Sequence, residues 1–211
     1  MIKIARTPIR EQVYEWILEE IITGTHPAGS KLRDSDLAKA SGVSRTPVRE
    51  ALIRLEREGY LVNHLNRGFE VVSTKKETIL EIYAIIAELE SFALGQIESI
   101  PDPVVDTLTV INGEFEKTGI PLFDRITLDI RWHAALLSTC RNETLIQLIH
   151  TLKKKTMWFE ITYMKDTESV RISSGDHHRI VTLAQKARMT PAAALLKLNC
   201  LRSKNVIESE K

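Results

Sequence analysis

The stretch that most constrains the fold runs from Gly42 to Leu55. Gly42 suits a sharp turn, Ser44 has the position of a helix N-cap, and Pro47 falls in the first helical turn, where its missing N–H costs no hydrogen bond. Apolar residues then recur at helical spacing, namely Val48, Ala51, Leu52 and Leu55. A short helical pattern over residues 35–41 precedes the turn. The sequence therefore predicts two helices joined by a tight glycine turn.

Two arginines stand on the outer face near the start of the second helix. Arg45 and Arg49 lie one turn apart, where the positive end of the helix dipole opposes their charge. An anion within reach of both side chains would remove this conflict. Such a turn, followed by a Ser-Arg-Thr helix start, is typical of a helix-turn-helix that presents its recognition helix to the DNA major groove. A plain helical hairpin with solvated arginines is the alternative interpretation.

The residues before this pair predict one more helix and a short extended segment. Thr7 and Pro8 are typical of a helix N-cap and a first helical residue. The apolar stripe that follows comprises Ile9, Val13, Trp16, Ile17, Ile21 and Ile22. Residues 31–33 predict a short extended piece, after which Asp34 or Ser35 caps the next helix.

A hairpin is predicted after the second helix of the pair. Residues 61–63 and 69–72 have the apolar, β-branched composition of two strands. Asn66, Arg67 and Gly68 have the composition of the hairpin tip, where Arg67 can reach a phosphate or the adjacent minor groove. Helices and hairpin together predict a winged helix-turn-helix domain over residues 1–73.

A set of residues within this domain carries a family resemblance: Gly24, Pro27, Ala28, Gly29, Leu32, Leu37, Ala38, Val43 to Leu52, Leu55, Glu58, Gly59 and Asn66 to Val71. With this set, residues 7–73 resemble the GntR-type bacterial transcription regulators. The positions that match operator contacts in that family are Ser44, Arg45, Thr46 and Arg49, and the wing glycine, Gly68, lies close to the DNA. Arg33 and Arg67 complete the predicted DNA-binding set.

The composition of the chain indicates how it could bind DNA and in which cellular compartment it is expected. The formal net charge of the 211 residues is only +1, so DNA binding has to come from locally placed charge. Cys140 and Cys200 show no paired spacing and favour free thiols in a reducing compartment. The start, Met1–Arg6, lacks the apolar core of a signal peptide, and no apolar run is long enough to cross a bilayer. We expect a cytoplasmic protein with no membrane partner.

Residues 74–211 predict an all-α bundle of about six helices, so the fold class is mainly α. Thr74 and Glu77 have the spacing of a capping box at the domain junction. Proline, glycine and asparagine residues separate the helical patterns, whose predicted ends lie near residues 98, 117, 140, 165, 188 and 207.

The third of these helices carries polar residues on an apolar stripe made of Leu122, Ile126, Asp129, His133, Leu136 and Cys140. Asp129 and His133 therefore point into the bundle, where an unpaired carboxylate would be costly. The two side chains can share a metal ion or satisfy each other through a hydrogen bond. Of the two later histidines, His177 lies nearer the inward face of its helix and His178 is the solvated neighbour. Asn199 lies at the edge of the apolar stripe of the last helix.

These positions resemble the FCD effector domain of the FadR-type branch of the GntR family, in the shorter form of the VanR-like subgroup. Many members hold a metal with an aspartate and a histidine one turn apart and two later histidines. Asp129, His133 and His177 match three ligand positions, whereas Asn199 stands where histidine is usual, with Cys200 beside it. An amide oxygen is a weaker and harder ligand than imidazole, which lowers the affinity or shifts the metal preference. These nitrogen and oxygen ligands suit a divalent metal such as zinc or nickel, and the sequence does not choose between the two. A metal-free polar cavity is the alternative.

Four further residues could line an effector pocket: Ile86, near which many relatives carry an arginine, and Trp132, Tyr163 and Arg171. The resemblance implies a homodimer on a palindromic double-stranded operator, with a small effector, such as a carboxylate, bound in the helical domain. The alternative function is a metal-dependent enzyme that activates water at Asp129, His133 and His177 and uses the winged helix as a protein-contact module. Against it, we find no separate general base or nucleophile in the sequence.

Overall fold

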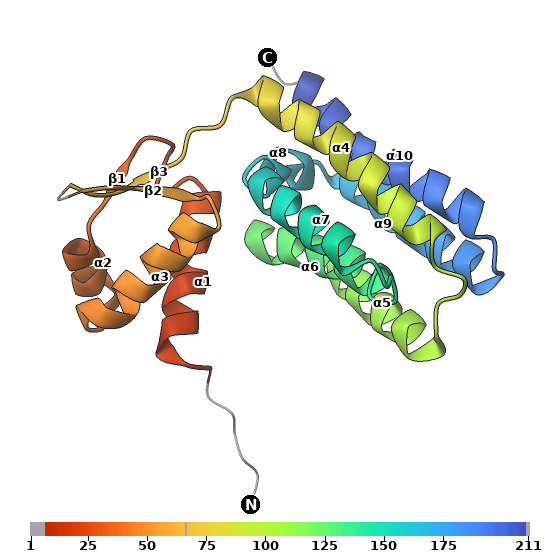
Figure 1. The fold of residues 1–211 in the computed structure, drawn as a ribbon, viewed down its shortest axis with the longest axis horizontal. Helices are drawn as coiled ribbons and strands as arrows, with labels where there is room; N and C mark the ends of the chain where they lie inside the picture. The colour runs from red at the N-terminus through yellow and green to blue at the C-terminus, as the bar shows by residue number, and fades with distance from the viewer. Residues whose placement is uncertain (1–6, 66, 210–211) are drawn as a thin grey trace, which may run out of the picture. The chain divides into compact units, whose positions relative to one another are not determined.

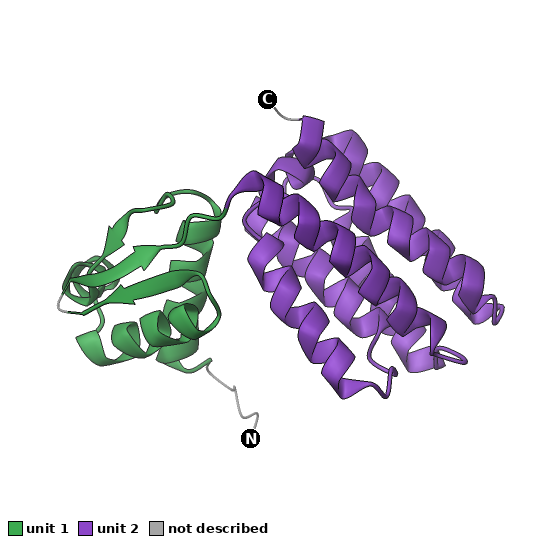
Figure 2. Cartoon of the chain, turned by 45° about the horizontal axis from the view of Figure 1, so that its top comes forward, with its two compact units in different colours: residues 1–74 green, residues 75–211 purple. Residues whose placement is uncertain are grey.

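The computed structural model describes residues 7–65 and 67–209, and within them the chain forms ten helices and three strands (Figure 1). Two compact units comprise residues 1–74 and residues 75–211 (Figure 2). The predicted fold class, a winged helix-turn-helix followed by an all-α bundle, is confirmed. The interpretations made on Met1–Arg6 and on Asn66 lie outside the described residues.

The first unit packs three helices against a small antiparallel sheet. Its elements are α1 (Ile9–Ile22), β1 (Lys31–Leu32), α2 (Asp34–Ser41), α3 (Arg45–Arg57), β2 (Leu61–His64) and β3 (Gly68–Val71). The strand order is β1-β3-β2, with Lys31 opposite Glu70 and Leu61 opposite Val71. The sequence predicted only the β2–β3 hairpin; the extended piece before α2 is a third strand because it pairs with the other edge of β3.

Glycine and serine make the predicted turn between α2 and α3. Gly42 has a φ of +70°, the left-handed conformation that ends a helix at glycine without strain. Ser44 occupies the N-cap position of α3, although its side chain makes no capping hydrogen bond. The apolar face of α3 is buried as predicted, through Val48, Ala51, Leu52 and Leu55. These contacts orient α3 and leave its opposite face to solvent.

Three predicted helix starts are wrong by one or two residues. α1 begins at Ile9 because the carbonyl of Pro8, rather than of Thr7, accepts the first backbone bonds; Ile9 itself is 58% exposed. α2 begins at Asp34 with Arg33 in the N-cap position, so neither Asp34 nor Ser35 caps it. The capping box at Thr74 does not form, because α4 starts at Lys76 after Lys75.

The second unit is a bundle of the seven remaining described helices: α4 (Lys76–Gly95), α5 (Asp102–Phe115), α6 (Leu122–Leu136), α7 (Glu143–Thr156), α8 (Glu160–Lys165), α9 (Thr167–Gln185) and α10 (Met189–Ser209). α10 packs along α4 and against α9, while α5 packs along α6 (Figure 1). Apolar residues of α4, α5, α6, α9 and α10 form one core, which surrounds the polar side chains described below.

The predicted helix from residue 142 to residue 165 is divided into α7 and α8. The hydroxyl of Thr156 donates to the carbonyl of Lys153, and Phe159 N–H donates to the carbonyl of Thr156, so a tight turn replaces the helical hydrogen bonds. The third predicted helix also ends early, at Leu136, which places Cys140 after α6 rather than on its stripe.

Candidate nucleic-acid interface and candidate metal centre

The predicted recognition helix α3 begins with exposed polar side chains. Ser44, Arg45, Thr46 and Arg49 are all exposed, and the Arg45 and Arg49 side chains keep 66% and 63% of their accessible surface. They project from a helix whose other face is fixed by packing, so their backbone positions do not depend on a ligand. This is the arrangement that the sequence predicted for residues that contact DNA.

The anion that Arg45 and Arg49 require is supplied within the unit by Asp34. Arg45 donates to both Asp34 oxygens at 2.8 and 3.0 Å, and Arg49 donates to one of them at 3.4 Å. Partial burial raises the pKa of Asp34, but the hydrogen bonds from Arg45 outweigh it and hold the pKa below its usual value. Asp34 was missed in the sequence because it was assigned to capping α2.

A concave pocket of about 650 Å³ brings together most of the predicted DNA contacts, namely Arg33, Arg45, Arg49, Arg67 and Gly68. The other residues that line it are Lys31, Asp34, Ser35, Asn63, His64 and Phe69. We call it the basic concavity. Gly68 has a φ of +84°, and a Cβ there would lie 2.9 Å from the carbonyl oxygen of Leu32, so only glycine fits. Ser44 and Thr46 are exposed beside it but are not among its lining residues.

We expect Asp34→Asn to increase binding to random-sequence duplex DNA several-fold while lowering the ratio of operator to random affinity. The substitution removes a negative charge from the basic concavity, which strengthens sequence-independent attraction to phosphate. It also releases Arg45 and Arg49 from a common partner, so their side chains are less ordered before they meet base edges. Fluorescence anisotropy with both duplexes at one salt concentration measures the two affinities.

Asp36→Asn is the matched control, since Asp36 lies in the first turn of the same helix but does not line the basic concavity. It changes net charge equally and should move random-DNA affinity much less. Equal effects of the two substitutions would show that Asp34 acts only through net charge.

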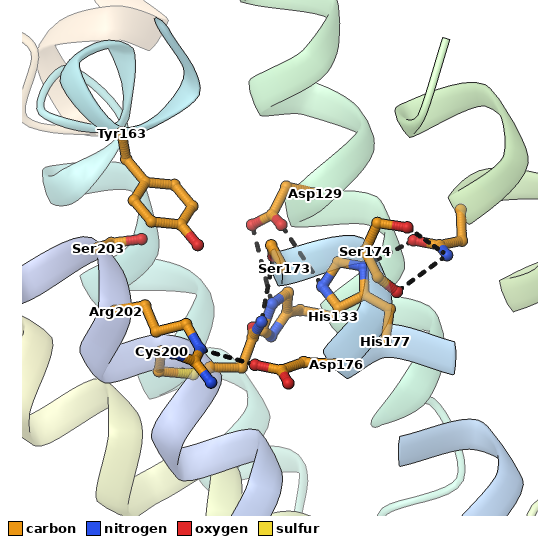
Figure 3. A network of polar contacts seen from close by, with 12 residues as sticks. Asp129, His133, Tyr163, Ser173, Ser174, Asp176, His177, Cys200, Arg202 and Ser203 are labelled. Carbon is orange, nitrogen blue, oxygen red and sulfur yellow. Dashed lines mark hydrogen bonds and ion pairs between the residues drawn. The ribbon is translucent and has the colours of Figure 1, made fainter. Parts of the chain in front are cut away.

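In the second unit, Asp129 and His133 on α6 meet His177 on α9 in the middle of the bundle (Figure 3). The Asp129 carboxylate lies 3.8 Å from Nε2 of His133 and 3.7 Å from Nε2 of His177. Both distances are too long for hydrogen bonds. The expected alternative, a hydrogen-bonded Asp129–His133 pair, is therefore wrong in this structure. One ligand atom from each of the three residues lies within 4.8 Å of the others.

The outer nitrogen of each imidazole is held by a partner that orients the ring. Nδ1 of His133 donates to the carboxylate of Glu90 at 2.6 Å. Nδ1 of His177 donates to the amide oxygen of Asn112 at 2.9 Å, since the Asn112 nitrogen donates to the carbonyl of Ser174. The Nε2 atoms of both rings are thereby directed at Asp129. Such outer partners are the usual supports of metal-binding histidines.

His177 has the properties of a metal-binding histidine. Its ring is completely buried, and Nε2 has no hydrogen-bond partner within the described part of the chain. Burial lowers the pKa of His177 well below its usual value, which keeps the imidazole neutral and its lone pair available. An unpaired buried nitrogen is costly, and a cation between Asp129, His133 and His177 would satisfy it. The residues present therefore fit a divalent metal.

Sequence reasoning missed four polar residues around this centre, namely Glu90, Asn112, Lys153 and Glu160. Glu90 on α4 accepts from His133, lies 2.9 Å from the ammonium of Lys153 and accepts from the thiol of Cys200 at 3.0 Å. Burial alone raises the pKa of Glu90, but the charges of His133 and Lys153 hold it well below its usual value. The helical spacing of Glu90 from Ile86 and Ile82 could have revealed it, since all three lie on the buried face of α4.

Glu160 lies on the other side of the centre. Its carboxylate accepts from the hydroxyls of Tyr83 at 2.8 Å and Ser203 at 3.1 Å. Burial, reinforced by the charge of Asp129, raises the pKa of Glu160 to about 7. Glu160 was missed because it starts α8, an element that the sequence merged with α7.

The remaining predicted site residues divide between the centre and the surface. Ile86, Tyr163 and Asn199 line a cavity of about 20 Å³ beside Asp129 and His133. Asn199 donates to the hydroxyl of Ser173 at 3.1 Å. Trp132 stacks on His177 with ring centroids 3.7 Å apart. Arg171 is not brought to this cavity: it is 72% exposed and paired with Glu168, because it lies on the outer face of α9.

Among the described residues, no helix has the length and apolar composition needed to cross a membrane.

Comparison with known families divides the chain in the same way as its two units. Residues 9–71 match the bacterial regulatory proteins of the gntR family, and residues 81–198 match the FCD domain. The HTH-type transcriptional regulator YdhC of Bacillus subtilis is 27% identical over 97% of this chain and 95% of its own length. The Nta operon transcriptional regulator of Aminobacter aminovorans is 28% identical over 80% of each chain. The transcriptional repressor GlaR of Escherichia coli is 25% identical over 87% of this chain and 88% of its own.

Solved structures share the fold over the whole chain. A GntR transcriptional regulator from Rhodococcus sp. RHA1 superimposes with a TM-score of 0.76 at 22% identity, covering 97% of this chain and all of its own. McbR/YncC of E. coli superimposes with a TM-score of 0.77 at 18% identity, covering 97% of this chain and 99% of its own. At these identities the likeness concerns the fold alone.

Proposed function

The chain belongs to the GntR family of bacterial regulatory proteins and carries an FCD domain, and we propose that it binds a palindromic operator as a homodimer whose affinity a small carboxylate controls. The regulator function follows from the family. The operator contacts, the dimer, the metal and the class of effector are the proposal.

The observation that carries the proposed DNA contacts is the convergence of Arg33, Arg45, Arg49 and Arg67 on the basic concavity. In a chain of net charge +1, this local concentration of arginine marks a binding surface for a polyanion. Arginine offers a planar fork that can be bidentate to guanine or can clamp a phosphate. The exposed hydroxyls of Ser44 and Thr46 suit phosphate contacts that fix register.

A homodimer would place two recognition helices about one DNA turn apart. Support for a second copy comes from α4, where Ile85 and Phe92 are 48% and 58% exposed on either side of Glu88. Ile85 and Phe92 lie two helical turns apart and so share one face of α4, which a second copy would cover. Light scattering of the full chain measures whether the solution mass is twice that of one chain.

The proposed metal ligands are Asp129, His133 and His177, with Asn199 near the usual position of a fourth. Imidazole and carboxylate ligands suit zinc or nickel. A bound divalent cation would offer a coordination position to an effector carboxylate. The chain's own contribution is to keep His133 and His177 oriented through Glu90 and Asn112, and to hold the centre inside an apolar core.

The free cavity of about 20 Å³ has room for little more than a water molecule, so an organic effector has to displace side chains around it. Its walls come from α4, α6, α7, α8, α9 and α10, and an effector there would therefore favour a different arrangement of these helices. Regulation requires that the effector bind the two arrangements with different affinity.

The proposal is tested on an operator selected from random duplexes with the full chain. Mono-, di- and hydroxycarboxylates are added singly to the metal-loaded operator complex, and dissociation is followed by anisotropy. We expect at least one compound to change operator affinity about fivefold or more. If none changes it, control by a carboxylate is wrong, whereas operator binding itself would stand.

The alternative of a metal-dependent enzyme has no support from the relatives, which are named as transcriptional regulators. Hydrolytic turnover that disappears with the metal would be the observation in its favour.

A further inference from the structure

A second cavity of about 190 Å³ opens between α6 and α7, and its lining includes His133. Five of the eleven residues that line this groove, which we call the α6–α7 groove, are aliphatic: Ile130 and Ala134 from α6, Leu137 directly after it, and Ile146 and Ile149 from α7. Glu90, His133 and Lys153 also line it. The groove is therefore on the Nδ1 side of His133, which faces Glu90, whereas Asp129 lies near Nε2.

The charged residues that line the α6–α7 groove are mostly cationic. Arg131, Lys153 and Lys154 are basic and His150 is titratable, while Glu90 is the one acidic member of the lining. Glu90 is already bound to His133 and Lys153. Arg131 is exposed and has no ion pair or hydrogen bond of its side chain within residues 7–65 and 67–209. The lining therefore offers an anion a partner that the unit itself does not neutralise.

Size and lining together define the occupant. A buried cavity of about 150 Å³ lined by aliphatic side chains holds benzene, so a groove of about 190 Å³ suits a compact body of six or seven carbons. The exposed guanidinium of Arg131, next to Ile130 on α6, can pair with one carboxylate attached to that body. We propose that the α6–α7 groove binds small monocarboxylates with a compact apolar body, with the carboxylate paired to Arg131 and the body against Ile130, Ala134 and Ile146.

This site is separate from the proposed metal centre and does not require a metal. It is nevertheless connected to that centre, because Lys153 and Glu90 line the groove and Glu90 orients His133. A carboxylate bound at Arg131 would add a negative charge to the same lining that Glu90 and Lys153 share. The groove would thus give the helical unit a second ligand-binding site beside the metal centre.

The test uses cyclohexanecarboxylate as the probe, with the full chain both metal-loaded and chelator-treated, and calorimetry as the readout. We expect a dissociation constant on the order of 0.1–1 mM in both preparations. Cyclohexanecarboxamide, which keeps the body but not the charge, and acetate, which keeps the charge but not the body, should each bind at least about tenfold more weakly.

Two variants locate the probe. Arg131→Gln should weaken binding about tenfold, while Arg141→Gln, which removes the same charge from an exposed residue outside the groove, should leave it unchanged. Ala134→Phe should abolish binding by filling the groove. If this variant fails to fold, Arg131→Gln still decides the question, because Arg131 is on the surface.

Any other result would overturn the proposal that the α6–α7 groove binds a carboxylate. Absence of binding at about 10 mM probe would do so, as would binding that Arg131→Gln leaves unchanged. Binding that disappears when the metal is removed and ignores Arg131 would place the carboxylate at the metal centre, which supports the proposed function while removing the groove as a site. Operator binding is measured for the same variants. If it is unchanged, a failure of the groove proposal leaves the DNA-binding proposal intact.

Discussion

Alanine at both Arg45 and Arg49 is expected to weaken operator binding by about 100-fold or more, because each arginine in bidentate contact with a base contributes roughly 1–3 kcal/mol. Each single substitution should remove most detectable binding in a gel-shift assay. Both side chains are more than 60% exposed, and their ion pairs with Asp34 are at the surface, so folding stability should fall by about 1 kcal/mol or less. Circular dichroism and thermal unfolding check that the fold is retained.

Arg57→Ala is the control for this prediction. Arg57 is exposed on the same helix but lies at its C-terminal end and does not line the basic concavity. Its removal should lower operator affinity only slightly. The salt dependence of binding separates base-reading arginines from phosphate-binding ones, since removing a side chain that binds one phosphate reduces the slope of log affinity against log salt by about one. Specific binding that survives in the double variant would refute the assignment of α3 as the recognition helix.

His177→Gln is expected to remove the metal. Wild-type chain, purified without chelator or affinity tag, should carry about one divalent ion per chain, held by a histidine whose Nε2 otherwise has no partner among the described residues. Replacing that ligand should weaken metal binding more than about 100-fold, beyond the 10- to 100-fold typical of losing an outer partner such as Asn112. Elemental analysis gives the stoichiometry, and competition with a chelating dye gives the affinity.

The adjacent histidine provides a matched control. His178 is 60% exposed and faces Glu116 rather than Asp129, so His178→Gln should keep the metal. Equal metal loss in both variants would show that the effect is general destabilisation of α9. A wild-type chain that binds neither zinc nor nickel, even when they are added, would remove the metal from the proposal and leave the effector to be held by the polar side chains of the cavity.

Local sequence rules predicted most of the first unit because its signals are short-range. Gly42, Ser44 and Pro47 each act on the backbone within a few residues, so the turn and the start of α3 follow from their chemistry alone. The same locality explains the errors, because whether α1 begins at Pro8 or at Ile9 depends on which carbonyl accepts its first backbone hydrogen bonds, and helix ends vary by one or two residues.

The candidate metal centre was predicted in part. Asp129, His133 and His177 could be selected because helical periodicity places each of them on an apolar face. Glu90, Asn112 and Glu160 could not be assigned to the same site, since they come from three other helices and no local pattern links them.

The sequence by itself determined the two-part architecture, the helix α3 with its exposed arginines, and the inward face of each metal-binding candidate, because each depends on backbone geometry and periodicity along one element. Only the tertiary structure decided what those side chains meet. It paired Arg45 and Arg49 with Asp34, set Glu90 and Asn112 behind the two histidines, and kept Arg171 at the surface. The physical reason is that a polar group's state depends on partners brought from distant parts of the chain, and packing between helices chooses those partners.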